Sequence, residues 1–485
     1  MQRLSRPRST WTTFSGGVER AGLFGTARSG SSSLSRTLFA ATCPPSRALT
    51  VAGRLAPMRT SSSGVAPLFT SARPGIAARV FPRLATATNG AALRPATLLR
   101  RANSTVTHQA TQPGVMPKVA AATWHDVPTS MKVWIAGCTA TVFGMVVVGG
   151  LTRLTESGLS MVDWGVLQMK PPITQEEWEA EFDKYKQFPE YKKLNSKMTV
   201  EEFKSIYYYE WAHRNLGRFL GAAYTLPLLY FTARGHVRGP LRTRLYAIAA
   251  GIGFQGLLGW YMVKSGLVEK DHPRVSQYRL AAHLGSAFVL YTAMLWTTFD
   301  FVLTPLTTTA KLTTSAAASA AAASAPTVLK LQAKMRKYAH GVAGLVFLTA
   351  ISGAFVAGLD AGLIYTDFPY MGGQLVPNEI LDMDPKWRNF TENDVTVQFQ
   401  HRVLGITTFS SIVAMWLWSR KVPLPPRSRL AMNALLGMAS LQVTLGIATL
   451  YTLVMTHVAA THQAGSLTLL SIATWLMHEL KRLPK

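Results

Sequence analysis

Long apolar segments alternate with polar loops along most of the chain. They lie at residues 132–151, 213–232, 242–263, 280–302, 338–358, 401–419, 430–452 and 457–478. A helix needs about 20 residues to cross the hydrocarbon core of a bilayer, where backbone polar groups must be hydrogen-bonded within the segment. The pattern therefore predicts an all-α membrane protein with eight transmembrane helices.

The charges of the loops indicate how these helices are oriented. Two loops carry four basic residues each and no acid, namely Arg234, Arg238, Arg242 and Arg244 in one, and Arg420, Lys421, Arg427 and Arg429 in the other. The loop at 358–400 has seven acids against two bases. Basic loops stay on the inner side of a membrane, so both termini are expected there. The short loop at 264–279 fits this orientation less well.

The chain repeats itself on either side of a linker at 303–337. The repeated motifs, in the same order, are Ser157-Gly158-Leu159 with Ala361-Gly362-Leu363, His213-Arg214 with His401-Arg402, and Gln255-x-x-Leu258-Gly259 with Gln442-x-x-Leu445-Gly446. Each half holds four predicted helices, so both enter the membrane in the same direction. The halves, 125–302 and 338–480, are expected to be two four-helix bundles related by a pseudo-twofold axis along the membrane normal.

Composition changes the picture at both ends of the first half. The first 105 residues hold fifteen arginines, no lysine and a single acid, Glu19. An Arg-rich, Ser-rich, acid-poor leader is typical of a mitochondrial presequence, which predicts an inner-membrane protein with both termini in the matrix. The alternative is a disordered basic tail that binds nucleic acid, but no such partner is needed. The Ala/Ser/Thr-rich linker at 303–337 is expected to be disordered in the matrix.

Four histidines occupy matching places in the two halves and are the main candidates for chemistry. His213 and His401 each open a His-Arg-x-Leu-Gly motif, and His283 and His462 each start the apolar segment two helices later. Histidine inside a membrane is costly and marks a functional site. We expect the second and fourth helices of each half to pack as neighbours, so that two imidazoles face each other, as in axial ligation of haem iron.

Other interpretations of the histidines remain. Each could satisfy a buried hydrogen bond without binding any ligand. Copper also binds imidazole, although no Cys or Met lies in a matching place beside both pairs. Zinc favours a third or fourth protein ligand, and none is duplicated.

Charged residues beside the histidines distinguish the two halves. Arg214 and Arg402 follow their histidines, and Arg153 follows the first apolar segment, so these arginines are candidates for binding haem propionates, or for plain interfacial snorkelling. Glu210 stands three residues before His213, whereas Gln398, which cannot ionise, stands three before His401. Glu210 is therefore a candidate for proton transfer in the first half, or a carboxylate placed by the helix dipole.

Together these motifs resemble the haem A synthases, over roughly residues 125–480. The resemblance rests on the stretch from Gly149 to Ser160, on Glu210-Trp211-Ala212-His213-Arg214, on Phe399-Gln400-His401-Arg402 and on Thr461-His462-Gln463. It implies oxidation of a methyl group of haem O to the formyl group of haem A, the haem of cytochrome c oxidase. It also implies that His401 and His462 ligate a resident haem b through its iron, that His213 and His283 bracket haem O, and that Glu210 is the catalytic carboxylate.

The resemblance also implies partners. They are haem O, a ferredoxin-type electron donor in the matrix, haem O synthase, cytochrome oxidase assembly factors and membrane lipid, with no nucleic acid; a homo-oligomer stays open. Two other functions fit the histidine pairs: a non-enzymatic bis-histidine cytochrome b that relays electrons, and a haem carrier. The first leaves Glu210 unexplained, and the second is not supported by matching Gly/Pro-broken helices.

Overall fold

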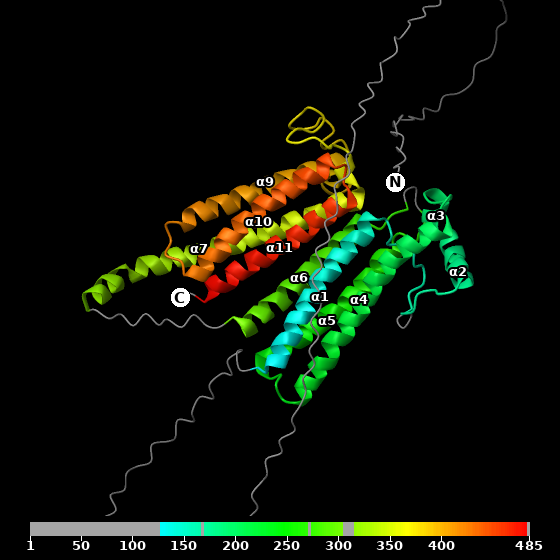
Figure 1. Ribbon diagram of the computed structural model, residues 1–485. Coiled ribbons are helices and arrows are strands. Elements are labelled where there is room, and N and C mark those ends of the chain that lie inside the picture. Colours follow the sequence, from blue (N-terminus) through cyan, green and yellow to red (C-terminus); the bar gives the residue numbers. More distant parts are fainter. Residues whose placement is uncertain (1–126, 166–168, 270–272, 304–314, 483–485) are drawn as a thin grey trace, which may run out of the picture. The chain divides into compact units, whose positions relative to one another are not determined.

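The structure is a computed structural model, and it describes residues 127–165, 169–269, 273–303 and 315–482 (Figure 1). The predicted presequence at 1–105 lies outside the described residues. So does part of the predicted linker, at 304–314. The presequence therefore stays a prediction.

Within the described residues the regular structure is helical, apart from one isolated bridge between Met371 and Gln374. The helices of 26 residues or more are α1 (Thr129–Leu154), α4 (Val200–Ala233), α5 (Gly239–Lys264), α6 (Gln277–Val302), α7 (Ser315–Leu359), α9 (Asp394–Ser419), α10 (Pro426–Tyr451) and α11 (Thr456–Lys481). The shorter elements are α2 (Gln175–Lys186), α3 (Pro189–Lys193), η1 (Ala361–Leu363), η2 (Lys386–Arg388) and α8 (Asn389–Glu392). The all-α prediction is confirmed for these residues.

Seven of the eight predicted apolar segments fall within one of the eight long helices, and the segment 430–452 extends one residue beyond the end of α10. By length and composition, five candidate membrane spans are found among the described residues: α1, α5, α6, the 326–359 part of α7, and α10. The other three long helices, α4, α9 and α11, each carry one of the candidate histidines. Polar residues in α4, α9 and α11 lower the mean hydropathy of these helices.

Two helices begin well before the predicted starts at 213 and 401. Helix α4 begins at Val200 because Thr199 and Glu202 form a capping box, in which each side chain binds the other residue's backbone N–H. Helix α9 begins at Asp394, where the Asn393 side chain accepts from the N–H of Thr396. His213 and His401 therefore lie inside long helices, one to several turns beyond the helix start.

The expectation of a disordered linker over 303–337 is wrong from residue 315 onward. Helix α7 begins at Ser315 and runs to Leu359 without a break. The cause is composition, since alanine has the highest intrinsic helix propensity and this stretch is rich in it. The low complexity of this Ala-rich stretch therefore accompanies a helical backbone preference from Ser315 onward.

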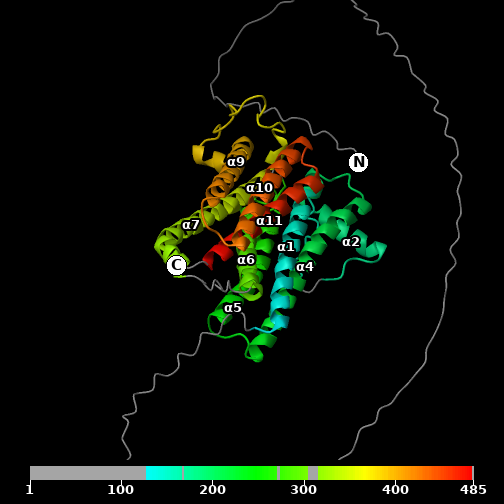
Figure 2. The same cartoon turned by 60° about the vertical axis from the view of Figure 1, so that its left-hand side comes forward.

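The long helices pack in two groups of four (Figures 1 and 2). In the first group α1 contacts α4 and α6, and α5 contacts the same two helices. In the second, α7 contacts α9 and α11, and α10 contacts these two as well. Helices α1 and α6 meet α7 and α11 where the groups join. The helices that carry paired histidines, α4 with α6 and α9 with α11, therefore lie at opposite corners of a group.

This diagonal arrangement corrects the expectation that these helices pack as neighbours. The axes of neighbouring helices are about 8–10 Å apart. This distance leaves no room for a ligand between two facing imidazoles. Histidines on diagonal helices instead point into the interior of a bundle from two sides. A flat ligand between them is compatible only with the diagonal arrangement.

A polar hairpin precedes the long part of α4. Helices α2 and α3 fold against the first turns of α4 around an aromatic cluster formed by Met161, Trp178, Phe182, Tyr185, Phe203 and Tyr207. Figure 1 shows α2 and α3 beside the N-terminal part of α4. The hairpin thereby holds the 157–165 segment close to Glu210 and His213.

Candidate functional site

Each of the four candidate histidines packs against a glycine of a neighbouring helix. A Cβ atom built on the glycine would lie close to the imidazole Cε1: 2.8 Å for Gly149 with His213, 3.3 Å for Gly259 with His283, 3.2 Å for Gly353 with His401, and 3.0 Å for Gly446 with His462. These distances are at or below the limit of ordinary Cβ contacts, so any side chain there would displace the ring. Glycine lets the helix backbone approach the imidazole closely.

The close contact of these four glycines with the histidines was not predicted from the sequence. Gly259 and Gly446 belong to the repeated Gln-x-x-Leu-Gly motif, and Gly149 and Gly353 each stand eight residues before the repeated Ser/Ala-Gly-Leu motif. Their recurrence was a usable signal. Its meaning required knowledge of which helix faces each histidine.

The Nδ1 atoms of three histidines meet polar side chains. The contacts are Ser352 Oγ to His401 at 2.7 Å, Gln442 Nε2 to His462 at 3.2 Å, and the Gln255 amide, in the orientation that satisfies its surroundings, to His283 at 3.1 Å. In both glutamines the amide nitrogen that faces Nδ1 also donates to the backbone carbonyl of the same histidine, at 3.3 Å in His283 and 2.8 Å in His462. These contacts orient the three rings.

The histidines also come together as two pairs. The imidazoles of His213 and His283 interact electrostatically, as do those of His401 and His462. All four residues are half-buried and keep accessible surface although they lie on the inner sides of their helices. Among the described residues no group of three or more His, Cys, Asp or Glu forms a metal cluster. Paired imidazoles suit iron in a haem, which supplies its own equatorial ligands.

Glu210 is buried, 2% exposed, and fully engaged by hydrogen-bond donors. Its carboxylate accepts from Ser160 Oγ at 2.8 Å and from the backbone N–H of Met161 at 2.7 Å. The Arg214 guanidinium donates to the other carboxylate oxygen at 2.7 Å, forming an ion pair along one face of α4. Glu210 therefore joins α4 to the 157–165 segment one turn before His213.

Arg214 and Arg402 hold corresponding backbone segments. Arg214 donates to the carbonyls of Met161 at 2.7 Å and Asp163 at 2.8 Å. Arg402 donates to the carbonyls of Tyr365, Asp367 and Tyr370 at 2.8 to 2.9 Å. These arginines thus position the segments that follow α1 and α7. The Nε atom of Arg402 is buried without a partner, which leaves it one donor for an acceptor such as a propionate.

Gln398 stands in the second group where the first has Glu210, but it makes a different contact. Its amide donates to the carbonyl of Tyr365 at 2.8 Å, beside the Arg402 guanidinium. The Gln398 amide oxygen is buried without a hydrogen-bond partner, whereas both carboxylate oxygens of Glu210 accept hydrogen bonds.

Arg153 lies where the two groups meet. Its guanidinium pairs with Asp360, which follows α7, at 2.8 Å, and Asp360 also pairs with Arg274 at 3.3 Å. The Nε atom of Arg153 is buried without a partner. Like Arg402, Arg153 has one unused donor facing the protein interior.

A second buried carboxyl lies in the polar hairpin. Glu190 accepts from the Tyr185 hydroxyl at 3.0 Å, and Asn195 donates to that hydroxyl at 2.8 Å. The pKa of Glu190 is raised to about 8, chiefly by burial and also by the charges of Glu210 and Glu156, while the hydrogen bond from Tyr185 and the charge of Arg153 act in the opposite direction. Glu190 was not singled out from the sequence, since nothing in the pattern of α3 marks it as buried.

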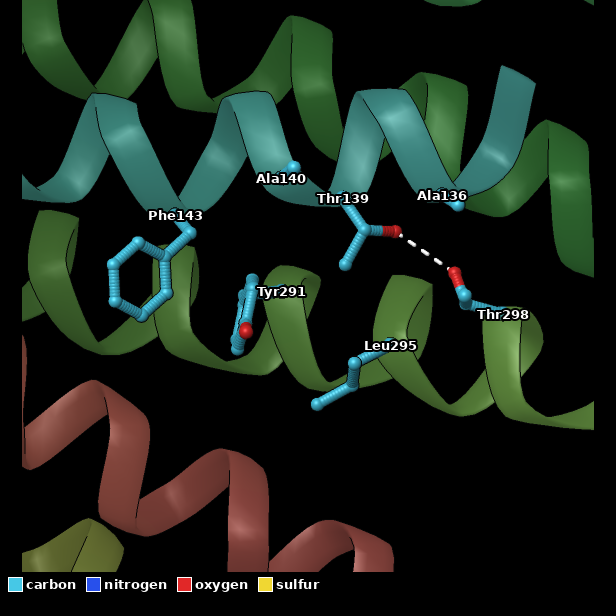
Figure 3. Close-up of a pocket in the computed structure, with 7 residues that line it drawn as sticks. All are labelled: Ala136, Thr139, Ala140, Phe143, Tyr291, Leu295 and Thr298. Atoms are coloured by element: carbon cyan, nitrogen blue, oxygen red, sulfur yellow. Dashed lines mark hydrogen bonds between the residues drawn. The ribbon is translucent and has the colours of Figure 1, made fainter. Parts of the chain in front are cut away.

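A hollow between α1 and α6 is separate from the histidines. It is lined by Ala136, Thr139, Ala140, Phe143, Tyr291, Leu295 and Thr298 (Figure 3). Thr139 and Thr298 are joined across it by a 3.0 Å hydrogen bond. Phe143 is six residues from Gly149 along α1, about 9 Å at 1.5 Å per residue, so this hollow is not the space between His213 and His283.

Comparison with known proteins agrees with the site. Residues 132–474 match the family of cytochrome oxidase assembly proteins. The chain is 53% identical over 359 residues to the heme A synthase COX15 of Bos taurus, which covers 73% of this chain and 82% of that protein. It is 45% identical over 357 residues to the heme A synthase of Nitrosospira multiformis, covering 73% and 95%. It is 42% identical over 367 residues to a heme A synthase-mitochondrial ferredoxin fusion protein of Schizosaccharomyces pombe, covering 72% and 59%. The chain belongs to the cytochrome oxidase assembly protein family.

Proposed function

We propose that the chain is a haem A synthase, which oxidises a methyl group of haem O to the formyl group of haem A for cytochrome c oxidase. The observation that carries this proposal is the pair of similar histidine sites, of which the first has a carboxylate, Glu210, one turn before its histidine and the second has the amide Gln398 at the matching position. Two equivalent electron-transfer sites would not need that difference. The names of the relatives support the same function.

The fold proposed with this function has eight transmembrane helices in two pseudo-twofold-related bundles. Support comes from the eight long helices and from their pairing, α1-α4-α5-α6 and α7-α9-α10-α11, with the same neighbour relations in both groups. We place the protein in the mitochondrial inner membrane with both termini in the matrix. The basic α4–α5 and α9–α10 loops favour this orientation, and the relative that is fused to a mitochondrial ferredoxin supports the mitochondrial location.

The residues present fit haem at both sites. His401 and His462 would hold haem b, and His213 and His283 would bracket haem O. The glycines facing each ring, the accessible surface left on the imidazoles and the unpartnered Nε donors of Arg153 and Arg402 all support this fit. Arg153, Arg214 and Arg402 are the candidates for propionate contacts, although Arg214 and Arg402 each already donate three hydrogen bonds within the protein.

The bound haem iron supplies the oxidative chemistry, which no side chain can perform alone. The protein's own part is to orient the substrate between two imidazoles and to exclude water. Glu210 is the group proposed to take up and release protons, because it is a carboxylate fixed one turn from His213. Its hydrogen bonds to Ser160 and Arg214 hold it in place for this role.

Electrons must reach the second site from outside the chain. We propose a ferredoxin-type donor, because one relative is fused to a mitochondrial ferredoxin. The basic loops that carry Arg238 and Lys421 would face that donor in the matrix, and both residues are exposed. Haem O synthase and cytochrome oxidase assembly factors remain proposed partners, as does a second copy of this chain.

The decisive experiment is expression with a haem O supply, followed by extraction and identification of haems A, O and b. We expect haem A from the native chain and haem O without haem A from a Glu210→Gln variant. A His401→Ala/His462→Ala variant is expected to lose low-spin haem b. A native chain that binds two haems but forms no haem A would favour the electron-relay function. Normal haem A formation by Glu210→Gln would remove Glu210 from the mechanism.

A further inference from the structure

One of the four candidate ligands, His213, differs from the others in how its ring is held. His283, His401 and His462 each have a side-chain partner at Nδ1, as described above. The Nδ1 of His213 is buried without a hydrogen-bond partner. The ring lies near the carbonyl of Met145, as the ring of His401 lies near that of Thr349, but no side-chain hydroxyl or amide binds its Nδ1. His213 is therefore packed against Gly149, but no side-chain hydrogen bond fixes its ring at Nδ1.

A single residue accounts for the difference. Ser352 directly precedes Gly353, the glycine that faces His401, and Val148 directly precedes Gly149, the glycine that faces His213. The two helices end alike, because Glu156 and Asp360, seven residues after these glycines, both adopt left-handed backbone angles, with φ of 53° and 55°. Val148 thus stands where the other half has a hydroxyl.

The hydroxyl of Ser352 does more than touch the ring. It donates its proton to the carbonyl of Thr349 at 2.7 Å, so towards His401 it can only accept. His401 must then carry its proton on Nδ1, which leaves Nε2 unprotonated and free to bind a metal. A second hydrogen bond of this kind fixes the tautomer and orientation of a ligand histidine and makes it a stronger donor. Ser352 is a positioning residue for His401.

We propose that His213 is an exchangeable ligand and His401 a permanent one, and that Val148 and Ser352 set this difference. The inference rests on the proposed function, in which the first pair receives a substrate haem and the second keeps a resident one. A substrate haem has to enter and leave in every turnover, so one loosely held ligand serves the reaction. A resident haem has to stay bound, and a ligand whose ring is fixed by a side-chain hydrogen bond serves that need.

The test exchanges the two residues in the full-length protein in detergent. Native protein loaded with iron protoporphyrin IX is mixed with excess apomyoglobin, and haem loss is followed by absorbance. We expect a fast phase from the first site and a slow phase from the second. Val148→Ser should slow the fast phase about five-fold, and Ser352→Val should speed the slow phase by a similar factor, the effect of about one net hydrogen bond.

Two further measurements distinguish the effect of the hydrogen bond at Nδ1 from a change in the stability of the whole protein. Ser352→Val should raise the reduction potential of the second-site haem, because its imidazole becomes a weaker donor. Ser352→Thr keeps the hydroxyl and Val148→Ile keeps the apolar surface, so both should behave as the native protein. If Ser352→Val fails to fold, Val148→Ser still tests the inference, because it adds a hydroxyl that can bind Nδ1 of His213.

The inference is overturned if Val148→Ser leaves the fast phase unchanged, or if Ser352→Val leaves the slow phase and the potential unchanged. It does not stand or fall with haem A formation. If the native chain forms no haem A but both phases respond to the substitutions as expected, the proposed function is wrong. The inferred role of Val148 and Ser352 then still holds.

Discussion

Arg214 and Glu210 form an ion pair of 2.7 Å in which both side chains are almost fully buried. Breaking such a pair by removing one partner leaves an uncompensated charge away from water. In the second group Arg402 makes the same kind of backbone contacts beside a neutral Gln398. The first group thus has an ion pair where the second has an arginine beside a neutral amide.

Arg214 is expected to matter more for stability than Arg402. Arg214→Ala should lower the free energy of unfolding by about 3–5 kcal/mol, because it strands a buried carboxylate. Arg402→Ala should cost about 1–3 kcal/mol, because it leaves only neutral carbonyls unpaired. Thermal unfolding in detergent measures both. The Glu210→Gln/Arg214→Ala double variant should recover most of the difference, and equal losses for the two single variants would contradict this account.

The glycines that face the histidines should control haem binding site by site. Gly353→Ala would place a Cβ 3.2 Å from the His401 ring and Gly149→Ala one 2.8 Å from the His213 ring. We expect Gly353→Ala to lose haem b and Gly149→Ala to lose bound haem O while keeping haem b. The haem content of purified protein measures the effect.

Gly344 provides the matched control for these substitutions. It lies on α7, two to three turns before Gly353, and a Cβ there meets nothing within 4 Å. Gly344→Ala should leave the haem content unchanged and, by helix propensity, raise stability by up to about 1 kcal/mol. Haem loss in Gly344→Ala equal to that in Gly353→Ala would show that α7 merely tolerates no alanine.

The helical repeat could be predicted from the sequence because it depends on local patterns. Apolar length and the repeated His-Arg motif placed His213 and His401 on helices in matching halves. The caps at Thr199 and Asn393, which move the starts of α4 and α9 upstream, were not recognised. Both are short polar signals in loops rich in similar residues, so the apolar pattern outweighed them.

The interior of the site could not be predicted in the same way. The sequence marked Glu210 as a carboxylate near His213, but its pairing with Arg214 and its bonds to Ser160 depend on how the 157–165 segment folds back. The facing glycines and the diagonal placement of α4 and α6 depend on which helices pack together. Loop closure and helix packing are tertiary properties, and periodicity does not encode them.

Asp300 is expected to hold the two helix groups together at the end away from the histidines. Its carboxylate binds Arg244 of α5 at 2.6 Å and His478 of α11 at 3.0 Å, with Lys481 at 3.7 Å. Asp300→Ala should lower the free energy of unfolding by about 1–3 kcal/mol, since it removes the carboxylate that binds the buried His478 imidazole. Asp300→Asn keeps an acceptor and should lose less. Equal melting temperatures for Asp300→Ala and native protein would rule out this role.

Glu190 should make the hairpin of α2 and α3 sensitive to pH. Burial raises its pKa to about 8 from an ordinary value of 4.5. A folded-state pKa above the unfolded value gives stability that is full below about 4.5 and is lost progressively as pH rises to about 8. Hydrogen exchange of α2 and α3 should therefore accelerate over this range beyond the intrinsic effect of pH. Glu190→Gln keeps an acceptor for Tyr185 without the charge, so its protection, corrected for intrinsic rates, should not change with pH. The same pH response in both proteins would show that another group is responsible.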